Sequence, residues 1–158
     1  MEIGDVTARL KVNLWGNDGG DTAFAVMPFV KLPTSSNTIG NKWVEGGVIL
    51  PLALTAFGNV GIGLMTEVDA VRNSGDTGYS AVFVNTATAG FDLTERFGLY
   101  TEIATAKSSE RGSAWEVSFD SGVTYALTDA VQLDAGVNVG LTAAAPGLNP
   151  FVGLSWRF

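Results

Sequence analysis

The chain has 158 residues, the length of one domain, and its formal net charge of −7 argues against the clustered basic surface that nucleic-acid binding requires. It contains no cysteine and no histidine, which excludes disulfides, thiolate metal sites and the histidine base of a serine hydrolase. Hydrophobic residues make up 46% and charged residues only 16%, yet no run of about 18 apolar residues could form a membrane helix. Composition therefore favours a protein that crosses a bilayer with strands, and leaves a soluble protein with a large apolar core as the alternative.

Alternation of apolar and polar residues with a period of two predicts strands along the whole chain and no amphipathic helix. In chain order, the expected strands cover 5–14, 22–32, 43–54, 60–69, 79–92, 97–106, 115–125, 131–142 and 152–158. The alternation is clearest in 131–142, where Val131, Leu133, Val137 and Val139 are separated by polar residues or glycine. The chain is therefore expected to form about nine strands, each with one apolar and one polar face.

The connections between these strands alternate in length. Short ones at 55–59, 93–96 and 127–130 alternate with longer polar ones at 33–42, 69–78, 107–112 and 143–149. Short turns at one end and longer loops at the other are typical of an up-and-down barrel in an outer membrane. We therefore predict an all-β fold, a single domain over 1–158 forming an antiparallel up-and-down transmembrane β-barrel. An even strand number with both termini in the periplasm implies lost strands, for example three from a twelve-strand barrel.

The aromatic residues indicate that the apolar face points toward lipid. Trp115 and Tyr125 bracket one strand ten residues apart, roughly 34 Å along an extended chain. At a tilt of about 40° this corresponds to roughly 26 Å of height, close to the apolar band of about 25 Å between aromatic girdles. Trp15 and Trp43 are exceptions, because they fall in phase with polar neighbours. Pro28 and Pro51 are expected at bulges or strand ends, since proline removes a hydrogen bond from the ladder.

Several segments resemble an outer-membrane family named for the MetA pathway of phenol degradation. The first is Gly4–Trp15, which is similar to the opening strand of that family, and the second is Met27–Thr34, which resembles its P-x-x-K-L-P-T-G motif except at Ser35, where the family has Gly. Val48–Leu54 and Leu99–Glu102 continue the same order. The resemblance implies a barrel transporter or channel in the cell outer membrane, with a role in the uptake of aromatic compounds. It also implies a signal peptide and N-terminal strands before the first motif.

The chain ends in Phe158, with Trp156 two residues before it on the same apolar face. This end resembles the terminal strand of outer-membrane barrels, where a closing aromatic residue is read by the outer-membrane assembly machinery. Assembly machinery, the lipid bilayer and a small-molecule solute are therefore the expected partners.

The polar face is expected to line the lumen, and acidic residues outnumber basic ones on it. The candidate lumen-lining residues are Arg9, Lys11, Glu45, Glu67, Glu102, Glu116, Asp120, Asp134, Asn138 and Arg157. Hairpin register places Glu102 near Asp120, with Glu116 diagonal to them, which allows either a cation site or ordinary solvated lumen charges. Asp134 and Arg157 are expected to form an ion pair across the last hairpin. An acidic lumen favours cations over anions.

The predicted function is a porin-like outer-membrane channel or transporter for passive uptake of small molecules, including hydrophobic or aromatic compounds. The alternative is a structural or loop-display barrel that conducts nothing, and a more distant one is a soluble carrier with an apolar lumen. We expect no enzymatic activity, no catalytic or metal-binding residues and no cofactor, because no histidine is present to act as a base.

Overall fold

The computed structural model describes residues 4–17, 20–35, 40–58 and 60–157. These residues form a single antiparallel sheet with no helix, and no membrane-spanning helix is found in this part of the chain. Phe158, the proposed assembly signal, lies outside the described residues. The strands are β1 (Val6–Arg9), β2 (Val12–Trp15), β3 (Thr22–Leu32), β4 (Glu45–Phe57), β5 (Val60–Arg72), β6 (Tyr79–Asp92), β7 (Phe97–Ser108), β8 (Glu116–Thr128), β9 (Val131–Gly140) and β10 (Leu148–Trp156).

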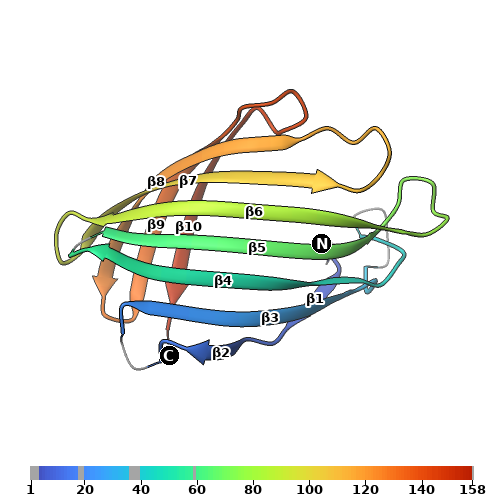
Figure 1. Ribbon diagram of the computed structural model, residues 1–158. Coiled ribbons are helices and arrows are strands. Elements are labelled where there is room, and N and C mark those ends of the chain that lie inside the picture. The colour runs from blue at the N-terminus through green and yellow to red at the C-terminus, as the bar shows by residue number, and fades with distance from the viewer. Residues whose placement is uncertain (1–3, 18–19, 36–39, 59, 158) are drawn as a thin grey trace.

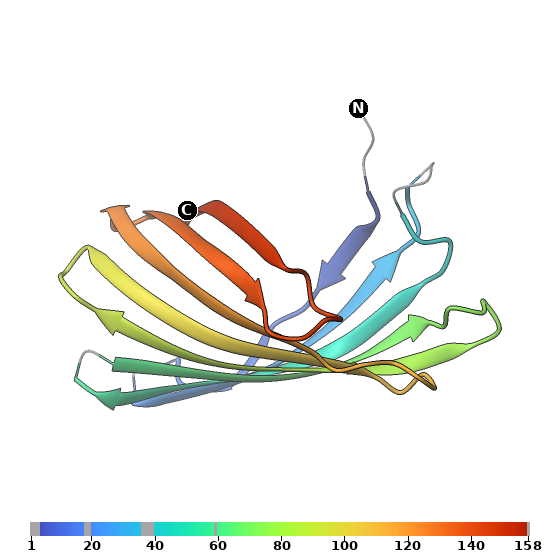
Figure 2. The same ribbon diagram turned by 90° about the horizontal axis from the view of Figure 1, so that it is seen from above.

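The strand order is β1-β3-β4-β5-β6-β7-β8-β9-β10, with β2 also paired to β3 (Figure 1). Each strand from β3 onward pairs with its sequence neighbour, so the up-and-down antiparallel topology is confirmed. The sheet is strongly curved into a trough with β1 and β10 at its two rims, and it does not close among the described residues (Figure 2). The connections 33–44, 73–78, 109–115 and 141–147, of six to twelve residues, lie at one end of the strands. The connections 16–21, 58–59, 93–96 and 129–130, of two to six residues, lie at the other. We refer to these as the loop end and the turn end.

β1 and β2 are two halves of one strand, interrupted opposite Pro28 in the middle of β3. The register continues across the break, from Arg9 opposite Phe29 to Val12 opposite Val26. The Leu10 amide still donates to the Pro28 carbonyl at 3.0 Å, but proline has no N–H to return the bond. This missing donor explains why the expected strand 5–14 is divided.

Pro51 has the same effect on the other side of β3. It pairs with Met65 of β5, but the ladder between β3 and β4 is interrupted opposite it, between the pairs Phe24–Leu52 and Met27–Ile49. Both prolines therefore lie inside strands, and the expectation of bulges or strand ends at these positions was wrong. The strands tolerate them because the missing N–H of each proline removes a hydrogen bond to only one of the two adjacent strands.

The two faces of the sheet have opposite chemistry, and the polar one is the better shielded. Along β5, Leu64 and Val68 are each 40% exposed, whereas Glu67 and Asp69 between and beyond them are half-buried. Directly paired residues share a face, so the register carries this division across the sheet, from Val68 to Phe83 on the apolar side. In a small soluble barrel the apolar side chains would instead be the buried ones. The apolar face therefore lies on the convex side of the trough, and the polar face on the concave side.

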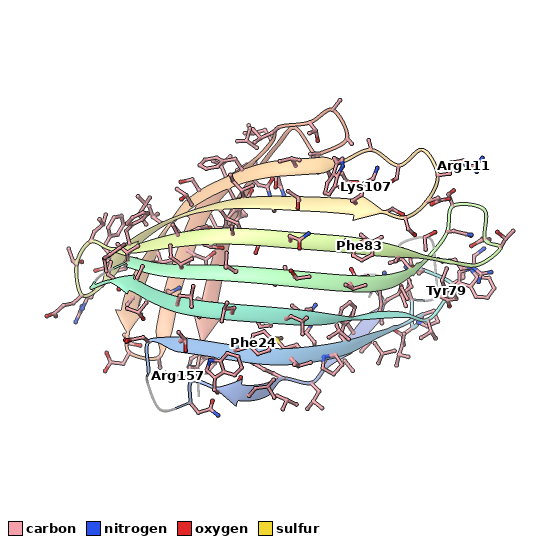
Figure 3. All side chains as sticks on the ribbon, in the orientation of Figure 1. Phe24, Tyr79, Phe83, Lys107, Arg111 and Arg157 are labelled. Atoms are coloured by element: carbon pink, nitrogen blue, oxygen red, sulfur yellow. The ribbon has the colours of Figure 1, made fainter. Side chains whose placement is uncertain are left out.

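Aromatic side chains gather at both ends of the convex face. At the loop end, the Arg72 guanidinium lies 4.0 Å from the centroid of the Trp43 ring and 5.4 Å from that of Tyr79, and the Trp43 indole N–H donates to Asp76 at 3.0 Å. Figure 3 shows Tyr79 at this end of the sheet and Phe83 farther along the same strand. Trp43 precedes β4, so its phase within the strand pattern carried no information.

At the turn end, a register shift between Asn13 and Trp15 turns the Trp15 side chain onto the convex face. There its ring stacks on Phe24 with 4.9 Å between the centroids. Both tryptophans that broke the sequence pattern thus lie in the aromatic zones at the two strand ends, where aromatic girdles are found.

Candidate functional site

The concave face carries the candidate functional residues, and its middle is crossed by one continuous row of directly paired positions. From β3 to β10 this row reads Ala23, Ala53, Gly63, Thr88, Glu102, Asp120, Asn138 and Asn149. Its first part consists of small residues and its second part of oxygen-bearing side chains. We call Ala23, Ala53 and Gly63 the small-residue floor, and Thr88, Glu102, Asp120 and Asn138 the oxygen row.

A cavity of about 390 Å³ lies over the small-residue floor. Besides the floor, Lys11, Asn13, Met65 and Thr88 line it, and Gly16 and Asn17 border it at the turn end. A Cβ added at Gly63 would meet nothing closer than the Thr88 side chain at 3.6 Å, so space remains above this glycine. The cavity therefore has a mostly apolar floor with polar groups at its edges, which is the composition of a site for small amphipathic molecules.

The oxygen row adjoins this cavity through Thr88, whose hydroxyl donates a short hydrogen bond to Glu102. Glu102 pairs directly with Asp120 on the next strand, which confirms the proximity expected from hairpin register. Asp120 is 8% exposed, and its Oδ1 atom accepts no hydrogen bond. Like charges directly opposite each other destabilise a sheet.

Glycines beside the oxygen row make room for larger side chains that lean across the strands. A Cβ at Gly122 would lie 2.5 Å from the Tyr100 hydroxyl, and one at Gly136 would lie 2.7 Å from the Phe151 ring. Tyr100, Gly122, Gly136 and Phe151 form the next row of directly paired positions toward the turn end. The two aromatic rings therefore cover the wall from β7 to β10, and Tyr100 lies next to the Glu102–Asp120 pair.

Two predicted lumen residues, Glu116 and Asn138, line a separate cavity of about 140 Å³ at the loop end. Ala145 and Pro146 of the 141–147 loop close this cavity, and a Cβ at Gly140 would collide with the Pro146 carbonyl. Glu116 lies four residues from Asp120 along β8, roughly 13 Å at the usual rise. The three carboxylates considered together in the sequence are therefore not one cluster.

Charged residues of the other half of the concave face meet at the loop end. The Lys31 ammonium lies 3.4 Å from Glu45 and 3.9 Å from Asp5. Glu45 also accepts a bond from the Arg72 amide at 3.0 Å. We call Asp5, Lys31 and Glu45 the loop-end ion cluster.

Asp5, which precedes β1, fixes the 33–44 connection. Its carboxylate accepts hydrogen bonds from the backbone N–H of Asn41 at 2.5 Å and from the backbone N–H of Ser35 at 3.1 Å. The Asn41 amide is the main cause of a lowered pKa for Asp5; burial opposes it, and the Ser35 amide and Lys31 reinforce it. The carboxylate is therefore held in its charged form in a loop that its two acceptor oxygens organise.

Two further predicted residues, Arg9 and Glu67, lie on the concave face toward the loop end. Arg9 lies over the Phe29 ring at 5.5 Å, and Glu67 shares the concave face with Asp69 near the loop end of β5. Arg9 and Phe29 are directly paired, as are Glu67 and Ile49. Arg9, Glu67 and Asp69 lie close enough for their charges to interact, and Glu67 and Asp69 share a side-chain hydrogen bond, so these residues gather toward the loop end of the concave face.

The expected ion pair between Asp134 and Arg157 was wrong. Asp134 pairs with Gly153, and its carboxylate lies over that glycine, where a Cβ would be 2.5 Å from Oδ2. The Arg157 backbone N–H donates to the Ala130 carbonyl, and the Arg157 guanidinium donates to the Asp129 carbonyl at 3.2 Å. The expected pairing assumed a register displaced by several residues, because the sequence does not show where the 141–147 loop begins and ends.

Comparison with protein families gives a match along almost the whole chain. The model of the family described as "Putative MetA-pathway of phenol degradation" covers residues 2–158. The chain belongs to this family. The resemblance seen in the short sequence motifs is thereby confirmed, and the all-β sheet agrees with it. A comparison with curated proteins finds no match.

What the sequence did not show is which residues become neighbours through pairing between strands. Ala23, Ala53 and Gly63 are ordinary small residues along the chain and become a floor only when three strands are aligned. The alternation places Tyr100 on the polar face, but its position over Gly122 depends on the β7–β8 register. Small residues recurring on the polar face were the available signal.

Proposed function

We propose that this protein forms the wall of an outer-membrane pore through which small molecules pass passively along the concave face. The observation that carries the proposal is the inverted burial: Glu67 and Asp69 are shielded, while Leu64 and Val68 are exposed on the convex side. A bilayer accounts for such a convex face, because apolar side chains gain nothing by remaining in water. Aromatic residues at both strand ends support the same orientation.

The solutes that fit the concave face are small molecules with an apolar body and a polar group. The small-residue floor accommodates the apolar part in a cavity of about 390 Å³, and the oxygen row beside it can accept hydrogen bonds from the polar part. Hydrophobic and aromatic compounds are the proposed class, which agrees with the family's description. Glu102, Asp120 and Asp134 make the wall acidic, so anions would be disfavoured.

A complete pore requires a closed wall. The backbone edges of β1, β2 and β10 have no partner strand in the described sheet. Strands that pair with these edges would complete the barrel, as in the twelve-strand arrangement expected from the topology, and would remove exposed edges. The proposal assigns no catalytic step and no cofactor to the chain. Its partners are the lipid bilayer, the solute and the assembly machinery of the outer membrane.

One observation favours a second candidate, a barrel that conducts little or nothing. The 141–147 loop lies against the concave face, with Pro146 at Gly140 and Ala145 over the small cavity beside Asn138. The Thr142 hydroxyl donates to the Trp115 carbonyl at 2.9 Å and accepts from the Val117 amide at 3.1 Å, which fastens this loop to β8. A loop held in this way narrows the opening at the loop end.

Conductance across a planar lipid bilayer tests the proposal. The full-length protein is refolded in detergent, inserted, and recorded with different salt concentrations on the two sides. Stepwise currents that prefer cations are expected, and replacing Glu102 with Gln should reduce that preference. A folded, inserted protein that gives no current would contradict the pore and favour the structural barrel. A variant lacking residues 143–146 would then show whether the fastened loop is the obstruction.

A further inference from the structure

Glu102 and Asp120 are two facing carboxylates that form no ion pair with a basic side chain among the described residues. Asp120 is 8% exposed, and its Oδ1 atom is buried without a hydrogen bond. Among the described residues, no lysine or arginine forms an ion pair with either carboxylate. Burying a carboxylate is costly unless it is paired or coordinates a cation. The charge of the pair therefore needs an offset other than a basic side chain, either a bound cation or a proton held by one of the carboxylates.

The residues beside the pair can supply oxygen ligands to a cation. Thr88 and Asn138 lie directly beside Glu102 and Asp120 in the oxygen row, and the Thr88 hydroxyl is already bonded to Glu102. No thiolate or imidazole ligand is possible, because the chain has neither cysteine nor histidine. Carboxylate, hydroxyl and amide oxygens are ligands for hard cations, and calcium accepts irregular sets that include water.

We infer that Glu102 and Asp120 bind a divalent calcium-type cation on the concave face, with Thr88 and Asn138 beside them. Two facing carboxylates carry the charge that one divalent ion neutralises, and a monovalent ion would leave a surplus. Magnesium fits less well, because it demands near-ideal octahedral geometry and gives up its water reluctantly. This site is independent of conduction, since it would form in a closed barrel as well as in an open pore.

Calcium titration of the full-length protein in detergent micelles, followed by calorimetry, tests the inference. One saturable site per chain is expected, with magnesium binding more weakly. Glu102→Gln and Asp120→Asn should each weaken calcium binding at least roughly tenfold, because affinity depends on the number of charged ligands. Glu116→Gln is the matched control: Glu116 is exposed and lies on the same strand and face as Asp120, so its replacement should leave binding unchanged.

A spectroscopic readout locates the ion without altering the carboxylates. Terbium replaces calcium at oxygen sites and emits when a nearby tyrosine is excited. Tyr100 lies in the row next to the pair, with its hydroxyl over Gly122, so Tyr100→Phe should reduce the sensitised emission while calorimetric affinity stays the same. This measurement keeps the inference testable if Asp120→Asn fails to fold.

Two results would overturn the calcium site. One is the absence of saturable calcium binding to the folded protein, together with an infrared carbonyl band of a protonated carboxyl group at neutral pH that Asp120→Asn removes. That combination would mean that the pair shares a proton instead. The other is equal weakening by Glu116→Gln and Glu102→Gln, which would indicate diffuse attraction of cations to an acidic wall.

Discussion

The two halves of the concave face handle charge in different ways. Toward β1–β5, the loop-end ion cluster joins Lys31 to Glu45 at 3.4 Å and to Asp5 at 3.9 Å. Toward β7–β10, Glu102 and Asp120 face each other in the middle of the wall without a described ion pair. The first arrangement holds a loop and the strand ends together. The second leaves carboxylate oxygens available to a cation or solute on the concave face, which is why the functional proposals rest on that half.

The halves also differ in how glycine is used. In the half with the cavity, a Cβ added at Gly61 would have no neighbouring atom within 4 Å, whereas Gly122 is covered by Tyr100 and by the Ala135 carbonyl. Both lie in the same row of paired positions across the sheet. The same residue type thus leaves space open in one half and accommodates a neighbouring ring in the other.

The largest expected effect comes from testing these two glycines. Gly122→Ala would place a Cβ 2.5 Å from the Tyr100 hydroxyl and 2.7 Å from the Ala135 carbonyl, and should lower the free energy of unfolding by about 1–3 kcal/mol. Gly61→Ala, in the same row, should be neutral or slightly stabilising. Urea unfolding in detergent, followed by tryptophan fluorescence, measures both. Equal costs for the two variants would refute the difference between the halves.

Breaking the loop-end ion cluster should have the next largest effect. Lys31→Met leaves the carboxylates of Asp5 and Glu45, whose side chains are 2% and 11% exposed, without their cation. We expect a loss of about 1–2 kcal/mol, reduced by the partial exposure of Lys31. The same unfolding assay tests it, with Lys42→Met as a control, since Lys42 is exposed and forms no described ion pair. An unchanged midpoint for Lys31→Met would show that the cluster contributes nothing.

Neutralising the other half should act in the opposite direction. With calcium removed by a chelator, Glu102→Gln relieves repulsion from Asp120 and should stabilise the protein by up to about 1 kcal/mol. The unfolding midpoint in chelator measures this change. Destabilisation of a similar size would mean that Glu102 is needed for its bond with Thr88 more than it is harmed by Asp120.

The smallest effect is a local dependence on pH. Asp5 has a lowered pKa, so its contribution is fully present above the unfolded value of about 3.9 and is lost as pH falls through the folded value. Exchange of the Asn41 amide hydrogen should therefore remain slow down to about pH 4 and accelerate only at more acidic values, relative to its intrinsic rate. In Asp5→Asn this step should disappear. A step that persists in the variant would assign it to another group.

Much of the architecture was predictable from the sequence, because strand alternation is a local property. The period of two indicated the strands and the polar face, and the pairing of Glu102 with Asp120 followed from the hairpin formed by the two strands expected at 97–106 and 115–125. Single residues that depart from the alternation were harder to predict. Trp15 reaches the convex face only through a register shift near the end of β2, and that shift has no signature in the residue pattern.

Longer-range features depended on information that a single strand does not contain. The Asp134–Arg157 pair failed because the length of the 141–147 connection sets the register of β10, and Asp134 meets Gly153 instead. The small-residue floor needs the alignment of β3, β4 and β5, so Ala23, Ala53 and Gly63 could not be recognised as neighbours. The loop bonds of Asp5 join residues about thirty to forty positions apart and follow no periodic pattern.

The most direct test of the central claim, a lipid-facing convex side and a wet concave side, is a spin-label scan along β5. The chain has no cysteine, so single cysteines can be placed one at a time from Leu64 to Ala70 in the full-length protein and labelled in lipid bilayers. Labels at 64, 66, 68 and 70 should be relaxed by oxygen dissolved in lipid, and those at 65, 67 and 69 by a water-soluble nickel complex. Accessibility in the opposite phase, or without a period of two, would contradict the account.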